Sequence, residues 1–259
     1  MRLLKIDDND EFSLVEHFGA AIPPYAILSH TWGPPTEEVS CKDLMEDTGH
    51  EKSGFAKLAF CAKMAAYNGL QHFWADVACI DKSSSAELSE AINSMFRWYK
   101  EAARCYVYMS DVTMDPFNIH SARERRTGGF RESRWFTRGW TLQELIAPAS
   151  VYFYSREEHL LGTRSSLKHE IHEVTGIPLK VLQERSMDGF TADERLSWAL
   201  GRETTREEDM AYALLGLMDI HMPLIYGEGR TKAFNRMLKE ITEELMTNKS
   251  NTDSSCVVS

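Results

Sequence analysis

Residues 133–148 (SRWFTRGWTLQELIAP) bring one glutamate, two arginines and two tryptophans together and end in a proline-containing stretch. Leu142, Leu145 and Ile146 are spaced i, i+3 and i+4, which predicts a short helix with these side chains facing inward. Glu144 falls off that face, so we expect its carboxylate at the rim of a site. A carboxylate held among fixed charges can stabilise positive charge as it develops on a bound ligand.

Arginines are concentrated in and just before this segment, at Arg123, Arg125, Arg126, Arg131, Arg134 and Arg138. The whole chain carries a net charge of −10, so its composition does not predict such a local positive field. Guanidinium groups bind phosphate oxygens through paired hydrogen bonds, which makes Arg134 and Arg138 candidate ligand-binding residues. A solvated loop is the alternative explanation for the same cluster.

Composition limits the kinds of protein that this chain can be. Its 259 residues suffice for one large domain, and the net charge of −10 argues against nucleic-acid binding, which depends on many phosphate contacts. The five cysteines are scattered and include no CxxC pair. This pattern favours a reduced, cytoplasmic protein over a disulfide framework or a metal site, so we expect no bound metal.

Neither end of the sequence predicts a membrane-spanning segment. Acidic residues follow Met1 within a few positions, which argues against a secretory signal, and no apolar run approaches membrane-spanning length. The last four residues, beginning at Cys256, match the C-a-a-X prenylation pattern. Little basic charge lies nearby, so we expect membrane attachment only if Cys256 is lipidated.

Strands and helices are predicted to alternate through the first part of the chain, which favours a parallel sheet flanked by helices. Strands are expected at 2–6, 25–33, 72–80, 104–109 and 150–154, and helices at 54–68 and 83–102. Residues 1–155 would thus form an α/β core. Helices expected at 193–200, 207–218 and 231–246 make residues 156–246 mainly helical, and the polar residues 247–259 are expected to be disordered.

The ends of the predicted strands carry the other candidate site residues. In open α/β sheets, ligands bind outside the carboxyl ends of the strands. Those ends place Ser29, His30 and Trp32 near Asp76 and Asp81. Structural alternatives exist for these side chains, because a histidine can hydrogen-bond at a strand end and an aspartate can cap the helix that follows.

Several ordered motifs resemble the fungal heterokaryon-incompatibility (HET) domain. They lie at 25–33 (YAILSHTWG), 74–82 (WADVACIDK), 138–145 (RGWTLQEL), 211–216 (AYALLG) and 223–229 (PLIYGEG). The resemblance covers residues 1–246 and looks closest to the N-terminal domain of vegetative-incompatibility NLR-like proteins. It implies a cytoplasmic cell-death effector that self-associates and works with a NACHT and WD-repeat receptor module in cis or in trans.

HET domains also look like remote relatives of TIR domains, whose enzymatic members cleave NAD⁺ with one glutamate. This likeness implies a TIR-like, flavodoxin-like sheet and an NAD⁺ glycohydrolase that needs no cofactor. In those members the glutamate lies in a Trp-Cys-Leu-x-Glu-Leu pattern on the helix after the third core strand. Residues 140–145 (WTLQEL) match that pattern except for Thr141 in place of cysteine. The resemblance therefore implies that Glu144 is catalytic and that NAD⁺ or a related dinucleotide is the substrate.

The implied chemistry requires few groups. Cleavage of the nicotinamide–ribose bond passes through an oxocarbenium-like ribose, and nicotinamide leaves as a neutral molecule without a general acid. One glutamate for the ribose, arginines for the pyrophosphate and an aromatic ring such as Trp32 suffice. Trp140 is a further ligand-binding candidate, with core packing as its alternative.

Two alternatives remain open from the sequence. At the residue level, Thr141 and Glu144 have the spacing of a capping box, in which the glutamate would satisfy a backbone donor at the helix start. At the level of function, a non-enzymatic scaffold could signal through homotypic contacts.

Overall fold

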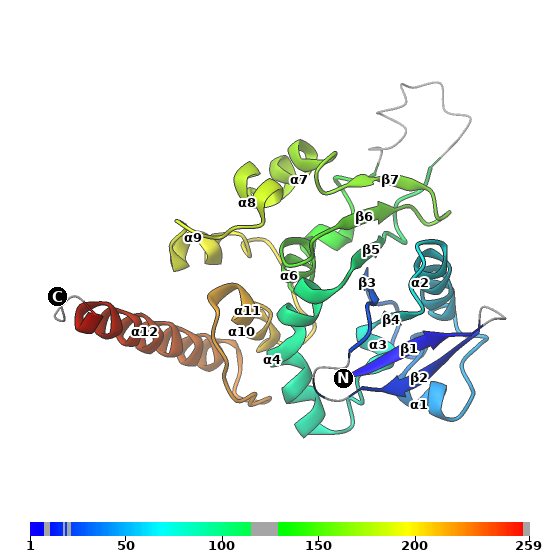
Figure 1. The fold of residues 1–259 in the computed structure, drawn as a ribbon, viewed down its shortest axis with the longest axis horizontal. Helices are drawn as coiled ribbons and strands as arrows, with labels where there is room; N and C mark the ends of the chain where they lie inside the picture. The colour runs from blue at the N-terminus through cyan, green and yellow to red at the C-terminus, as the bar shows by residue number, and fades with distance from the viewer. Residues whose placement is uncertain (8–10, 18, 20–21, 115–128, 256–259) are drawn as a thin grey trace.

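A single mixed sheet forms the centre of the protein (Figure 1). The computed structural model describes residues 1–7, 11–17, 19, 22–114 and 129–255. In these ranges the sheet has the strand order β2-β1-β4-β3-β5-β6-β7. The strands are β1 (Arg2–Ile6), β2 (Phe12–Glu16), β3 (Ala26–His30), β4 (His72–Trp74), β5 (Arg104–Tyr108), β6 (Val151–Tyr154) and β7 (Leu160–Thr163). The four inner strands from β4 to β6 run parallel, whereas β1, β2 and β7 are joined by antiparallel pairing. The α/β class is therefore confirmed.

Helices cover both faces of the sheet (Figure 1). Those of the α/β part are α1 (Cys41–Met45), α2 (Phe55–Tyr67), α3 (Asp76–Cys79), α4 (Ser85–Glu101), the 3-10 helix η1 (Arg134–Thr137) and α6 (Thr141–Ile146). Helix α2 packs on β3, β4 and β5, while α6 lies between β3 and α4. The chain leaves α6 at Pro148, because proline cannot continue the hydrogen-bond ladder of a helix.

The central strand β3 delivers polar side chains to the face that α6 covers. All five of its residues are buried, as expected for an inner strand of a parallel sheet. Because side chains alternate along a strand, residues one apart face opposite helices. Tyr106, on the neighbouring strand β5, reaches the backbone of Met64 in α2, whereas the hydroxyl of Ser29 reaches α6 on the other side.

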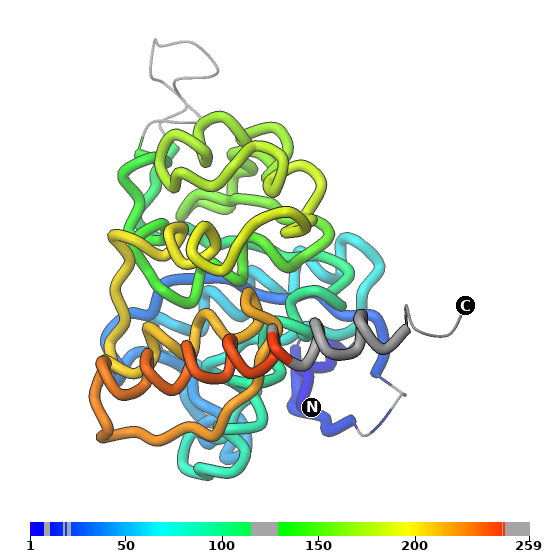
Figure 2. Tube along the Cα trace, turned by 90° about the vertical axis from the view of Figure 1, so that its left-hand side faces the viewer, coloured from blue at the N-terminus to red at the C-terminus, as the bar shows by residue number. Residues whose placement is uncertain are grey.

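The C-terminal part is mainly helical and returns to the edge of the α/β core (Figure 2). It comprises α7 (Lys168–Thr175), α8 (Leu179–Glu184), α9 (Ala192–Ser197), α10 (Asp209–Tyr212), α11 (Leu215–Met218) and α12 (Arg230–Ser255). Helix α11 packs on α4, and α10 packs on α12. The first of these contacts is so close that a Cβ atom on Gly216 would meet Phe96 at 2.0 Å, so only glycine fits there.

Several element boundaries differ from the sequence prediction. The strand predicted at 72–80 is wrong after Trp74, where β4 ends and α3 begins at Asp76. A short apolar run has no periodicity that separates a strand from a buried helical turn. The helix predicted at 207–218 is two short helices, α10 and α11, and α12 continues past Met246 to Ser255. The outer strands β2 and β7 are only partly buried, so no apolar run marks them in the sequence.

No helix in the described ranges is both long enough and apolar enough to cross a membrane. Four cysteines lie in these ranges, and all are buried and free. Burial raises the pKa of the Cys79 thiol to about 12, which leaves it unreactive near neutral pH. The prenylation candidate, Cys256, lies outside the described residues.

Candidate functional site

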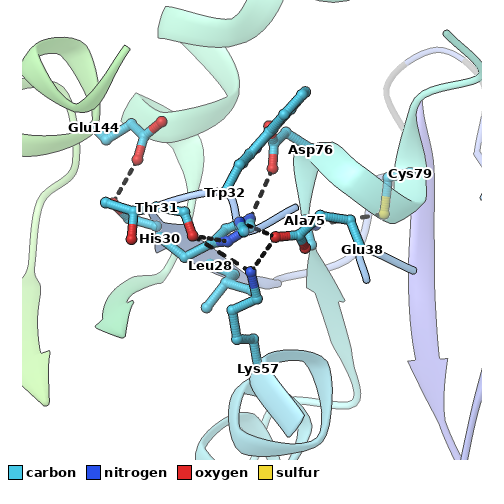
Figure 3. A network of polar contacts seen from close by, with 12 residues as sticks. Leu28, His30, Thr31, Trp32, Glu38, Lys57, Ala75, Asp76, Cys79 and Glu144 are labelled. Carbon is cyan, nitrogen blue, oxygen red and sulfur yellow. Dashed lines mark hydrogen bonds and ion pairs between the residues drawn. The ribbon is translucent and has the colours of Figure 1, made fainter. Parts of the chain in front are cut away.

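Glu144 projects from α6 toward the end of β3, near Trp32 and Asp76 (Figure 3). The Thr141 hydroxyl lies inside the first turn of α6 and donates to the backbone carbonyl of Trp135 at 2.6 Å. No side chain caps this helix, so the capping-box alternative for Glu144 is wrong. The Glu144 carboxyl instead accepts a hydrogen bond from the Ser29 hydroxyl at 2.5 Å.

Ser29 is fixed from its other side by a buried tryptophan. The indole nitrogen of Trp135 donates to the Ser29 oxygen at 2.8 Å, and the Trp135 ring packs edge-on against Phe153. Trp135 is completely buried and belongs to the core. The chain of bonds from Trp135 through Ser29 sets the position of the Glu144 carboxyl.

Glu144 is more enclosed than its sequence position predicts. The expected rim position is wrong, because every residue of α6 from Thr141 to Ile146 is buried and Glu144 itself is 7% exposed. The pKa of Glu144 is raised to about 8: burial is the largest cause and the nearby Asp76 charge acts in the same direction, while the Ser29 hydrogen bond opposes both effects. At neutral pH the resting side chain therefore carries its proton.

A buried arginine supports the turn that leads into α6. Arg202 donates through Nη1 to the carbonyl of Arg138 at 2.8 Å and to the hydroxyl of Thr141 at 2.9 Å. Burial lowers the pKa of Arg202 to about 10, while Glu144 has the opposite effect. The sequence offers no signal for this residue, because a single arginine far along the chain belongs to no recognisable pattern.

A cavity of about 180 Å³ opens beside Glu144. Its walls come from the end of β3, the start of α4, helix α6 and residues 205–226 of the C-terminal part. The sequence-predicted residues that reach these walls are His30, Trp32, Asp76, Arg138, Trp140 and Glu144. Glu144 is thus buried from bulk solvent but accessible to a ligand in the cavity.

Three side chains at the ends of β3 and β4 form one hydrogen-bonded group (Figure 3). His30 Nε2 lies 3.1 Å from Asp76 Oδ1, and the Trp32 indole nitrogen donates to Asp76 Oδ2 at 2.8 Å. Burial opposes ionisation of Asp76, but hydrogen bonds from His30 and Trp32 and the charge of Lys82 hold its pKa well below the usual range. Asp76 therefore presents a permanent negative charge to the cavity.

A buried ion pair anchors the loop that carries Trp32. In Figure 3, Lys57 rises from α2 below the strand end, while Glu144 approaches from above. Lys57 Nζ lies 2.5 Å from Glu38 Oε1, and the same carboxylate oxygen accepts the backbone N–H of Gly33 at 2.5 Å. Sequence reasoning missed this pair, because Lys57 lies on an otherwise apolar helix face and Glu38 lies in an irregular loop.

Three predicted site residues do not line the cavity: Ser29, which holds the Glu144 carboxyl, and Asp81 and Arg134, which lie farther away. Asp81 Oδ1 accepts hydrogen bonds from the backbone N–H and the hydroxyl of Ser83 at 2.9 and 2.6 Å. Asp81 therefore shapes the turn before α4, but the cap expected as its alternative role is supplied by Ser84. Arg134 is largely exposed, and its Nε lies 3.8 Å from a carboxylate oxygen of Asp111. Three further arginines lie outside the described residues, at Arg123, Arg125 and Arg126.

The positive charge at the cavity comes from a different set of residues than predicted. Of the predicted arginines, Arg138 lines the cavity, and Lys82 and Arg206 join it there. Lys82 Nζ lies 3.7 Å from the centre of the Trp32 ring, and the Arg206 guanidinium carbon lies 4.2 Å from the centre of the Tyr226 ring. The cations are brought together by folding from segments more than 50 residues apart, which no local sequence cluster reveals.

Comparison of the chain with known proteins identifies its relatives. Residues 25–128 match the model of the heterokaryon incompatibility protein (HET) family. This match identifies a HET-family region within the chain. It is similar to the vegetative incompatibility protein HET-E-1 of Podospora anserina, with 52% identity over 245 residues. That match covers 94% of this chain but 18% of the relative, and no solved structure matches.

Proposed function

We propose that this HET domain cleaves NAD⁺ or a related dinucleotide at the nicotinamide–ribose bond when it self-associates. The observation that carries this proposal is the Glu144 carboxyl in the wall of a cavity that also presents cations and aromatic rings. The likeness of residues 140–145 to the TIR glutamate pattern supports the same assignment. No protein-derived nucleophile is required.

The reaction breaks the bond between the pyridinium nitrogen and C1′ of the ribose. The bonding electron pair leaves with nicotinamide, which departs as a neutral molecule, and the ribose becomes an oxocarbenium-like cation. The ionised carboxylate of Glu144 stabilises this cation and holds the ribose hydroxyls. Water then adds to C1′ and releases one proton, so NAD⁺ and water give ADP-ribose, nicotinamide and a proton.

The proton on resting Glu144 is compatible with this role. A ligand that brings a positively charged pyridinium ring into the cavity favours the ionised carboxylate, because an opposite charge nearby lowers a carboxyl pKa. The permanent charge of Asp76 strengthens the attraction for the cation. His30 holds Asp76 in position through their 3.1 Å contact.

The size of the cavity decides which part of a dinucleotide enters it. Small-molecule sites commonly measure about 300 Å³ or more, so a cavity of about 180 Å³ accommodates only a fragment. The nicotinamide–ribose half is the fragment that must meet Glu144. The rest of the substrate then lies at the mouth, where the indole of Trp32 is 42% exposed and available for stacking.

The cellular role follows from the relative. HET-E-1 is named a vegetative incompatibility protein, and we extend that role to this chain as a cytoplasmic effector of incompatibility cell death. This chain spans 18% of that relative's length, so activation by an attached or separate NACHT and WD-repeat module fits the same proposal. Loss of NAD⁺ would itself be the cause of death.

Incubation of concentrated protein with NAD⁺ tests the proposal directly. We expect nicotinamide and ADP-ribose, or a cyclic form of it, with a specific activity that rises with protein concentration as the domain self-associates. Chromatography of the products against enzyme-free NAD⁺ gives the measurement. Glu132→Gln is a matched control, because Glu132 is an exposed glutamate outside the cavity.

The same assay separates the enzyme from the scaffold. A protein that assembles fully, as shown by light scattering, yet releases no nicotinamide would contradict the enzymatic proposal and favour signalling through homotypic contacts. Cleavage that is equally fast in Glu144→Gln would keep the enzyme but remove Glu144 from the mechanism.

A further inference from the structure

We propose that Arg206, Arg138 and Lys82 form a diphosphate-binding subsite at the mouth of the cavity. This inference rests on the proposed function, because the diphosphate is that of the dinucleotide whose ribose meets Glu144. It assigns a direct binding role to the C-terminal part, which supplies Arg206, and it gives a purpose to the PLIYGEG motif at 223–229.

The three cations are available for an anionic ligand. None of them lies within 4.0 Å of a carboxylate oxygen in the described ranges, whereas Lys63, Arg131 and Arg236 each have a carboxylate partner. Arg236, for example, contacts Glu228 at 2.5 Å. Asp76 lines the same cavity and offsets part of the positive charge of the three cations, and a diphosphate carries the negative charge that would balance the rest.

Arg206 is held in a way that leaves its hydrogen-bond donors open. Its guanidinium carbon lies 4.2 Å from the centre of the Tyr226 ring, which is a cation–π contact. Within the described ranges the Arg206 side chain donates no hydrogen bond, so its N–H groups are available for phosphate oxygens. The Tyr226 hydroxyl donates to Asp209 Oδ1 at 2.9 Å, and the Trp140 indole nitrogen lies 3.4 Å from Asp209 Oδ2.

The loop that carries Tyr226 is fastened by a second carboxylate. Glu208 Oε1 accepts the backbone N–H groups of Gly227 at 2.8 Å and Gly229 at 2.9 Å. Both glycines have positive φ angles, 94° and 80°, which other residues rarely adopt. The motif at 223–229 therefore sets the Tyr226 ring, and through it the guanidinium, at a fixed place in the cavity wall.

The other two cations that line the cavity come from the α/β core. Lys82 lies over the Trp32 ring at 3.7 Å, and Arg138 donates through Nη2 to the Thr205 hydroxyl at 3.1 Å. Two cation–aromatic pairs thus contribute to the walls of one cavity, one from the α/β core and one from the C-terminal part. A diphosphate between them would leave the nicotinamide ribose directed inward.

Calorimetric titration with ADP-ribose, using AMP as the monophosphate reference, tests the subsite without requiring turnover. We expect wild-type protein to prefer ADP-ribose, and Arg206→Ala to weaken ADP-ribose binding by about tenfold or more while changing AMP binding less. Tyr226→Phe retains the ring but loses the bond to Asp209, so a smaller loss is expected. Arg230→Ala is the matched control, because Arg230 lies 5.7 Å from the Phe234 ring outside the cavity.

The outcomes separate this inference from the proposed function. The subsite would be overturned if Arg206→Ala binds ADP-ribose as tightly as wild type while circular dichroism shows that it is folded. This holds even if NAD⁺ is cleaved. Failure of wild-type protein to bind ADP-ribose at millimolar concentration would overturn it as well. Binding that depends on Arg206 in a protein that never releases nicotinamide would retain the subsite and contradict the NADase proposal.

Discussion

Glu144 is most stable as a neutral acid, whereas its proposed role requires the ionised form. Its burial in α6 and the nearby Asp76 charge raise its pKa, and the Ser29 hydroxyl only partly compensates. Ionisable groups with strongly shifted pKa values are common in functional sites. Binding of the correct ligand can then change the protonation state of such a group. At the scale of one residue, this difference between the resting and the required protonation state leads to two predictions.

The first concerns the pH dependence of NAD⁺ cleavage. If ionised Glu144 is required, kcat/KM should rise about tenfold per pH unit below the pKa and level off above pH 8. Asp76 is already ionised and Arg202, with a pKa of about 10, is still charged over this range, so Glu144 sets the profile. Initial rates between pH 6 and 9 give the measurement. A rate that falls with increasing pH would assign the titration to a required acid instead.

The second prediction concerns stability. The pKa of Glu144 rises from 4.5 in the unfolded chain to about 8 in the fold, so the folded state binds more protons between these values. The contribution of Glu144 to the free energy of unfolding is then fully present at and below pH 4.5 and is lost toward pH 8, by an amount on the order of 5 kcal/mol. Glu144→Gln should remove this contribution. Its stability relative to wild type should therefore be greater at pH 8 than at pH 5.

Urea unfolding of wild type, Glu144→Gln and the surface control Glu132→Gln at both pH values measures the effect. The two pH curves of Glu144→Gln should lie closer together than those of wild type, while Glu132→Gln should follow wild type. Equal pH shifts in all three proteins would mean that Glu144 is not the destabilised carboxyl.

At the scale of elements, the cavity depends on loops as much as on helices and strands. The segment between β3 and α1 carries Trp32 and is anchored by Glu38 to Lys57 of α2. The close fit at Gly54, where a Cβ atom would meet the backbone oxygen of Glu37 at 2.5 Å, brings the loop and the helix together. The buried ion pair thus fixes this loop, as backbone hydrogen bonds fix a helix or a strand.

Removing one partner of this pair should therefore be costly. Lys57→Met leaves the Glu38 carboxylate buried without its cation, which we expect to lower the free energy of unfolding by about 3 kcal/mol or more. The double variant Glu38→Gln, Lys57→Met should recover part of the loss. Lys63→Met is the control from the same helix, because Lys63 pairs with Glu158 at the surface and should change stability by less than about 1 kcal/mol. Similar losses for both lysines in urea titrations would contradict the anchoring role.

At the scale of the whole molecule, the sequence predicts the α/β core better than it predicts the site. The inner strands β3, β5 and β6 are continuous apolar runs, and the rule that ligands collect at the carboxyl ends of parallel strands correctly brings His30 and Asp76 together. The antiparallel strands β2 and β7 lack such runs and were not predictable in this way. The same limit explains the error after Trp74, since a buried helical turn has the composition of a strand.

The cavity residues from the C-terminal part were not predicted from the sequence, for a different reason. Arg206, Asp209 and Tyr226 come from the C-terminal part, where no strand end marks them, and their proximity to Glu144 results from the packing of α11 on α4. Local charge density was a poor guide, because Arg134 lies within the predicted cluster yet points away from the cavity. Contacts of this kind become visible only in three dimensions.

The central claim is that the carboxylate of Glu144 stabilises the ribose cation, and the turnover number of Glu144→Gln tests it most directly. With saturating NAD⁺ at pH 8 and fully assembled protein, we predict a kcat at least about a hundredfold below that of wild type and of Glu132→Gln. ADP-ribose binding should be retained in all three proteins, because the diphosphate contacts lie elsewhere. A Glu144→Gln protein that releases nicotinamide at the wild-type rate would contradict the account.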